Sequence, residues 1–87
     1  MKTWSEIYLH MQWMLKDEPK SIYIGQLWGT AIHCAPDTQK FVQILQETIW
    51  RCEADKIQYA SDAGLVAECE TKISGNTELL AWIEGKQ

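Results

Sequence analysis

Residues 3–19 read TWSEIYLHMQWMLKDEP and contain the clearest helix signals in the chain. Thr3 and Glu6 have the spacing of a capping box, in which the two side chains accept hydrogen bonds from each other's backbone N–H groups. Pro19, which follows two acidic residues, predicts the end of the helix. At about 100° per residue, one side of this helix is apolar and is therefore its predicted buried face. The residues on that side are Trp4, Ile7, Tyr8, Met11, Met14 and Leu15.

The opposite side of the same helix also carries large apolar residues. Leu9 and Trp13 project from it among polar neighbours such as Gln12 and Lys16. Residues four apart on a helix are neighbours, so these two side chains form one apolar ridge. The ridge is either core, since a helix that is apolar all round is normally buried, or a contact surface for a partner. We predict a contact surface, because a small domain rarely encloses a helix completely.

A second helix begins at "PDTQKF", where Asp37 or Thr38 can act as the N-cap. We expect it to run from Thr38 to about Asp55, or on to Tyr59. Trp50 faces away from its apolar side, among polar residues, and is therefore another candidate for a contact surface. The predicted inner face consists of Phe41, Ile44, Leu45, Thr48, Ile49 and Cys52.

Two segments are ambiguous between helix and strand. Residues 21–35 fit both a helical stripe and an alternating pattern, and Gly25 and Gly29 weaken either element. The spacing of the two glycines also allows close packing of a helix against them. Residues 57–73 alternate from Leu65 onward, as a strand after a turn does. They equally fit a helix, which their content of Ala, Glu and Lys favours.

The helix interpretation of residues 57–73 has specific boundaries. Ser61 is its predicted N-cap, and Gly75 is its predicted C-terminal stop. A separate last helix, capped by Asn76 or Thr77, is then expected to follow and to end at Gly85.

These segments predict an all-α fold, a compact bundle of four to five short helices in a single domain over residues 1–87. The alternative is an α+β fold with a small antiparallel hairpin at residues 57–73. The longest weakly charged run, residues 21–35, is too short and too polar to span a bilayer, so we expect no membrane association.

The charge of the chain is negative and unevenly distributed. The net charge is −4, and residues 47–87 hold eight acids against four bases, which is the whole excess. This acidic balance argues against direct binding of nucleic acid, which needs clustered Lys and Arg. The first six residues lack the basic-then-apolar layout of a secretory signal, so we expect a cytoplasmic protein with reduced thiols.

Catalytic and metal-binding patterns are weak. Cys34, Cys52 and Cys69 form no CxxC pair, and the gaps between them contain none of the short ligand spacings of structural zinc sites. His33 and Cys34 are adjacent in sequence, so their side chains diverge on regular structure. We therefore expect no catalytic residue, no metal and no cofactor. The alternative is a small thiol- or metal-dependent enzyme or regulator that uses these cysteines.

The favoured function is a non-enzymatic protein–protein interaction module, a small inhibitor or adaptor with an aromatic patch and an acidic flank. Viral antagonists of bacterial defence or nucleic-acid machinery are of this class, an analogy of size and charge alone. The ridge of Leu9 and Trp13 can meet its own copy across a twofold axis, which makes a homodimer the simplest assembly. The predicted partner-binding residues are Leu9, Trp13, Trp50, Glu53, Glu68 and Glu70.

Overall fold

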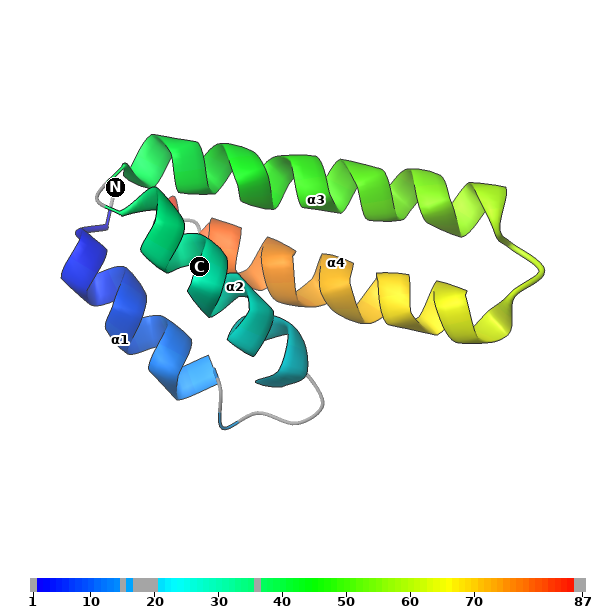
Figure 1. The fold of residues 1–87 in the computed structure, drawn as a ribbon, viewed down its shortest axis with the longest axis horizontal. Coiled ribbons are helices and arrows are strands. Elements are labelled where there is room, and N and C mark those ends of the chain that lie inside the picture. Colours follow the sequence, from blue (N-terminus) through cyan, green and yellow to red (C-terminus); the bar gives the residue numbers. More distant parts are fainter. Residues whose placement is uncertain (1, 15, 17–20, 36, 86–87) are drawn as a thin grey trace.

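The computed structural model describes residues 2–14, 16, 21–35 and 37–85, with the backbone alone for residues 21–26. This part of the chain forms four helices and no strand. They are α1 (Trp4–Met14), α2 (Ser21–Cys34), α3 (Thr38–Gln58) and α4 (Ala63–Ile83) (Figure 1). The all-α prediction is confirmed. The alternative hairpin at residues 57–73 is wrong, because those residues end α3, turn, and begin α4.

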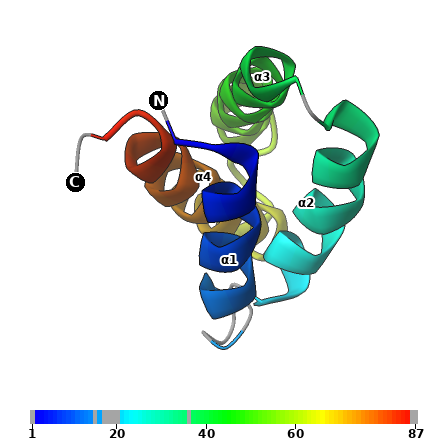
Figure 2. The ribbon, with the colours of Figure 1, turned by 90° about the vertical axis from the view of Figure 1, so that its left-hand side faces the viewer.

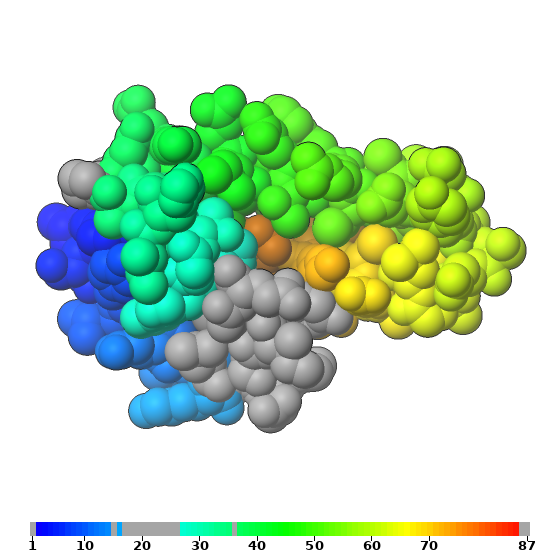
Figure 3. All heavy atoms as spheres, in the orientation of Figure 1, coloured from blue at the N-terminus to red at the C-terminus, as the bar shows by residue number. Residues whose placement is uncertain are grey.

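The two long helices form an antiparallel hairpin to which the two shorter helices are added. α3 and α4 have 21 residues each, and a short turn joins them. α1 and α2 pack against the end of the hairpin that holds the start of α3 and the end of α4 (Figures 1 and 2). The other end of the hairpin projects beyond them (Figure 3). The molecule is therefore elongated, with extents of 40 × 25 × 24 Å, rather than a bundle of uniformly short helices.

Side-chain caps mark the starts of α1 and α3. The predicted capping box is confirmed, since the Thr3 N–H donates to Glu6 Oε1 at 3.0 Å and the Glu6 N–H donates to Thr3 Oγ1 at 3.3 Å. Asp37 caps α3 as predicted, accepting from the Lys40 N–H at 3.0 Å. The predicted stop at residues 17–19 lies outside the described part of the chain, as do Leu15 and the surroundings of Gly25.

The predicted cap of α4 at Ser61 is wrong by one residue. Asp62 is the cap, because its Oδ1 reaches the Leu65 N–H at 3.1 Å. A carboxylate at this position also interacts favourably with the positive end of the helix dipole.

The predicted break at Gly75 is also wrong. Gly75 and Asn76 are buried within α4, which runs without interruption to Ile83. Asn76 does not cap a new helix, because its Nδ2 donates to the Lys72 carbonyl oxygen at 2.7 Å within the same helix. The helix ends before Gly85, as predicted, and Gly85 has a φ of +73°, a conformation that favours glycine.

The core lies where α1 and α2 meet the hairpin. Phe41 and Leu45 of α3 are fully buried there against residues of the other three helices. Gly29 is not a packing site, because it is exposed and a side chain built on it meets nothing within 4 Å. No helix in the described ranges is long and apolar enough to cross a membrane. The core residues are Ile7, Met11, Met14, Leu27, Ala31, Cys34, Phe41, Leu45, Leu79, Leu80 and Ile83.

Candidate protein-interaction surface

The ridge on α1 faces outward. Leu9 is 67% exposed and Trp13 is 59% exposed, so the alternative that this ridge is core is wrong. The reason is the position of α1 at the end of the hairpin, where one side of the helix covers the core and the other has no helix over it (Figure 2). Isolated apolar residues on a surface are common, but two large ones stacked on successive turns form a continuous apolar surface.

Trp13 is the outer ring of a stack that crosses from α1 to α4. Its ring lies 5.7 Å from that of His10, at an interplanar angle of 25°. The ring of His10 lies almost flat on Trp82, at 4.0 Å and 4°. Lys2 Nζ also lies over the Trp82 ring, 5.1 Å from its centre. We call Trp13, His10 and Trp82 the aromatic ladder.

One backbone hydrogen bond and side-chain packing hold the Trp82 end of the aromatic ladder in place. The Lys2 N–H donates to the Ile83 carbonyl oxygen at 3.3 Å, which fixes the amino-terminal residues beside the end of α4. Trp82 packs against the core as a partly buried residue. The exposed ring of Trp13 is therefore supported by a framework that includes two helices and the amino-terminal segment.

The surroundings of His10 favour its neutral form. Burial lowers the pKa of the imidazole, Glu78 raises it, and Lys2 lowers it further. Its Nε2 is buried and has no hydrogen-bond partner among the described residues. A neutral ring between two indoles avoids the cost of desolvating an imidazolium ion.

We expect this environment to make folding stability depend on pH. A histidine with a lowered pKa in the folded state contributes stability that is present above its ordinary pKa of 6.5 and is lost as the pH falls below that value. The thermal denaturation midpoint of the wild-type protein is therefore expected to fall between about pH 8 and about pH 5 more steeply than that of His10→Gln. His33→Gln is the matched control, because His33 is exposed on α2. Equal pH dependence in the wild type and His10→Gln would contradict the assigned environment of His10.

The structure does not place Trp50 beside the ridge. Trp50 is 63% exposed, but it lies on α3, nine residues after Phe41, which is about 13 Å along the helix. α1 starts next to Phe41, where the ring of Trp4 meets it edge-on at 5.7 Å, and then runs away from α3 (Figure 1). The predicted single aromatic patch is therefore two separate surfaces.

The predicted acidic flank is likewise separate from the ridge. Glu53, Glu68 and Glu70 are all exposed, on the second half of α3 and the first half of α4. Glu68 forms an ion pair with Lys72 of the next turn, at 3.4 Å. Two other charged residues, Lys2 and Glu78, lie near the aromatic ladder.

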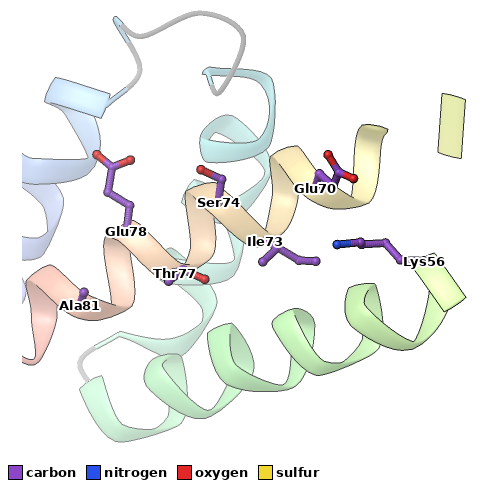
Figure 4. Close-up of a pocket in the computed structure, with 7 residues that line it drawn as sticks. All are labelled: Lys56, Glu70, Ile73, Ser74, Thr77, Glu78 and Ala81. Carbon is purple, nitrogen blue, oxygen red and sulfur yellow. The ribbon is translucent and has the colours of Figure 1, made fainter. Parts of the chain in front are cut away.

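A groove of about 500 Å³ runs along α4 on the hairpin (Figure 4). Lys56 of α3 closes it at one end, where its side chain points toward Glu70 and Ile73 of α4 (Figure 4). Hydroxyl groups and carboxylates line the groove, but no histidine or cysteine is among its lining residues, so it offers no nucleophile paired with an imidazole base. The lining residues are Lys56, Glu70, Ile73, Ser74, Thr77, Glu78 and Ala81.

The cysteines have the environment of packed core residues. Cys34, Cys52 and Cys69 are free and buried. Burial raises the pKa of the Cys52 thiol, and the neighbouring Cys69 raises it further, which disfavours the nucleophilic thiolate. No group of three or more His, Cys, Asp or Glu side chains in the described ranges could hold a metal ion. The alternative of a thiol- or metal-dependent enzyme therefore gains no geometric support.

The sequence pattern missed two members of the aromatic ladder. His10 lies three residues before Trp13, so its stacking on Trp13 has a signal in the sequence. Trp82 has none, because its place depends on how the end of α4 packs against α1. No protein-family model matches the chain, and comparisons with curated proteins and with solved structures give no match.

Proposed function

We propose that the protein is a non-enzymatic protein-interaction module, an inhibitor or adaptor, that binds a partner protein through Leu9, Trp13 and the aromatic ladder. The observation that carries the proposal is the exposure of two large apolar side chains, one of which is held in a three-ring stack. Tryptophan is the residue most typical of interface hot spots. A ring that is already ordered loses less conformational entropy on binding.

Burial of the ridge supplies enough free energy for specific binding when other contacts across the interface add to it. Desolvating one Trp and one Leu supplies roughly 3–6 kcal/mol before the costs of association. Exposed Glu6 and Lys16 flank the ridge and provide a polar rim of mixed sign, which is the usual anatomy of an interface. The net charge of −4 favours encounter with a basic partner.

We assign the ridge to a different protein rather than to a second copy of the chain. α1 has only 11 residues, and its ridge has two apolar side chains, so a symmetric contact between two ridges buries little area. A larger or concave surface on another protein can cover Leu9, Trp13 and Trp82 together.

Capture with matched variants tests this function. Three proteins are immobilised and exposed to extract from the native cell. They are the wild type, an α1 double variant (Leu9→Ser with Trp13→Ser) and an α3 double variant (Trp50→Ser with Ile57→Ser). The α3 double variant is the control, because it also removes two large exposed apolar side chains, but from a different helix. The expected result is a protein that the wild type and the α3 control retain and the α1 variant loses. Identical captures by all three baits, provided that circular dichroism shows all three to be folded, would contradict the proposal.

A further inference from the structure

The part of the hairpin nearest the turn buries two cysteines and no other residue. Between residues 46 and 74, only Cys52 of α3 and Cys69 of α4 are buried. They are 6% and 4% exposed, and neither belongs to the core that α1 and α2 form with the other end of the hairpin (Figure 1). The two thiols are therefore a separate buried pair, which we call the cysteine pair.

The two members of the cysteine pair lie at the same level of the hairpin. Cys52 lies six residues before the end of α3 at Gln58. Cys69 lies six residues after the start of α4 at Ala63. At 1.5 Å per residue, each is about 9 Å from the turn. Since the helices are antiparallel and both side chains are buried, the two thiols face each other across the hairpin.

The electrostatic surroundings of Cys52 agree with this placement. Burial is the main cause that raises the pKa of its thiol, and the charge of Cys69 and a hydrogen bond between the two side chains raise that pKa further. A hydrogen bond between the thiols requires that they are in contact. The third cysteine, Cys34, lies instead in the core at the end of α2.

We propose that Cys52 and Cys69 are a redox-active dithiol that a peroxide oxidises to an intramolecular disulfide linking α3 to α4. One cysteine, as its thiolate, attacks a peroxide oxygen. The S–O bond forms, the O–O bond breaks, and the leaving hydroxide takes up a proton to become water. The other thiol then attacks the sulfur of the sulfenic acid, so that the S–S bond forms, the S–O bond breaks and a second water leaves. In total the two thiols lose two electrons and two protons, and one hydrogen peroxide becomes two waters.

The oxidant reaches the cysteine pair when the end of the hairpin opens. The raised pKa keeps the buried Cys52 thiol protonated at neutral pH, so the closed form reacts slowly. All other residues of this part are exposed or only partly buried, so it opens at a lower cost in free energy than the core does. Opening hydrates the two thiols and removes the burial that raises the pKa of Cys52.

The disulfide is expected to stabilise the hairpin. It closes a loop that contains the turn and so restricts the unfolded chain. The thermal denaturation midpoint is therefore expected to rise by about 5 °C or more on oxidation, and to return to its original value on reduction with dithiothreitol. Neither cysteine is on α1, so this effect does not depend on the proposed partner surface.

Peptide mapping of oxidised wild-type protein tests the proposal. Dilute protein is treated with hydrogen peroxide, its remaining thiols are alkylated, and it is cut with trypsin without reduction. Cleavage after Lys and Arg places the three cysteines in three different peptides, residues 21–40, 52–56 and 57–72. The expected product is peptide 52–56 linked to peptide 57–72, with the loss of two hydrogen atoms, and an alkylated Cys34 in peptide 21–40.

Two variants complete the experiment. Cys69→Ala is expected to lose both the link and the rise in denaturation midpoint. Cys34→Ala is the matched control, because it also removes a buried cysteine, and it is expected to retain both. Circular dichroism verifies that each variant is folded, and the map of the wild-type protein does not depend on either variant.

Four results would overturn this assignment. The first is a wild-type protein in which Cys52 and Cys69 are both still alkylated after oxidation. The second is oxidation to sulfinic acid in place of a link. The third is a link that joins two molecules or that uses Cys34. The fourth is a link between Cys52 and Cys69 that leaves the denaturation midpoint unchanged or lowers it.

Discussion

Replacing Phe41 with alanine is expected to lower the free energy of unfolding by about 3–5 kcal/mol. Phe41 is fully buried, and its ring meets that of Trp4 edge-on at 5.7 Å, so the substitution removes both the packing of α3 in the core and the contact with the start of α1. A domain of 87 residues typically has about 4–13 kcal/mol of stability in total. The substitution is therefore expected to remove a large part of that stability and to lower the denaturation midpoint strongly.

Urea denaturation followed by circular dichroism measures this loss. Leu9→Ala is the control, because it removes a large apolar side chain that is mostly exposed, and its effect is expected to stay within about 0.5–1 kcal/mol. If the two variants had the same denaturation midpoint, the division of α1 into a buried face and an outward ridge would be wrong.

Replacing Trp82 with alanine is expected to destabilise the fold by about 2–3 kcal/mol and to dismantle the aromatic ladder. Trp82 is partly buried against the core, and its ring contacts both His10 and Lys2. Without its ring, His10 gains access to water. The pKa of His10 is therefore expected to rise toward its ordinary value, because burial is the main cause of its lowering.

Nuclear magnetic resonance titration of the histidine ring protons measures the loss of stacking on Trp82 and the rise in the pKa of His10. In the wild type, the stacked indole at 4.0 Å shields the His10 protons, and this shielding is expected to disappear in Trp82→Ala. Trp82→Phe retains an aromatic platform and serves as the control, with an intermediate shift. Unchanged His10 resonances in Trp82→Ala would show that the two rings do not stack in solution.

The sequence predicts a helix start or end correctly where the signal for it lies within a few residues. The capping box of Thr3 and Glu6, the Asp37 cap and the end at Gly85 all depend on contacts within a few residues, and the structure has each of them. Gly75 is a local signal that packing overrides. A glycine costs about 1 kcal/mol in a helix, whereas Cys69 before it and Leu79 after it are buried on one continuous face of α4.

The candidate site is only partly predictable for a related reason. The helical pattern places Leu9 and Trp13 opposite the buried face, but it cannot show whether another helix covers them. That depends on α1 lying at the end of the hairpin. The separation of Trp50 from the ridge and the contact of Trp82 with His10 both depend on packing between helices distant in sequence. No periodicity within one segment contains that information.

The most direct test of the central claim is the affinity of the purified partner obtained by capture for two forms of this protein. Isothermal titration calorimetry compares the wild type with Leu9→Ser and Trp13→Ser combined, at matched salt and pH. We predict a dissociation constant at least about 30-fold higher for the variant, because an exposed tryptophan at an interface typically acts as a hot spot. The variant is predicted to remain folded, with only a modest fall in its thermal denaturation midpoint, because neither side chain is part of the core. Equal affinity of the two forms, with both folded, would contradict the assignment of the ridge as the binding surface.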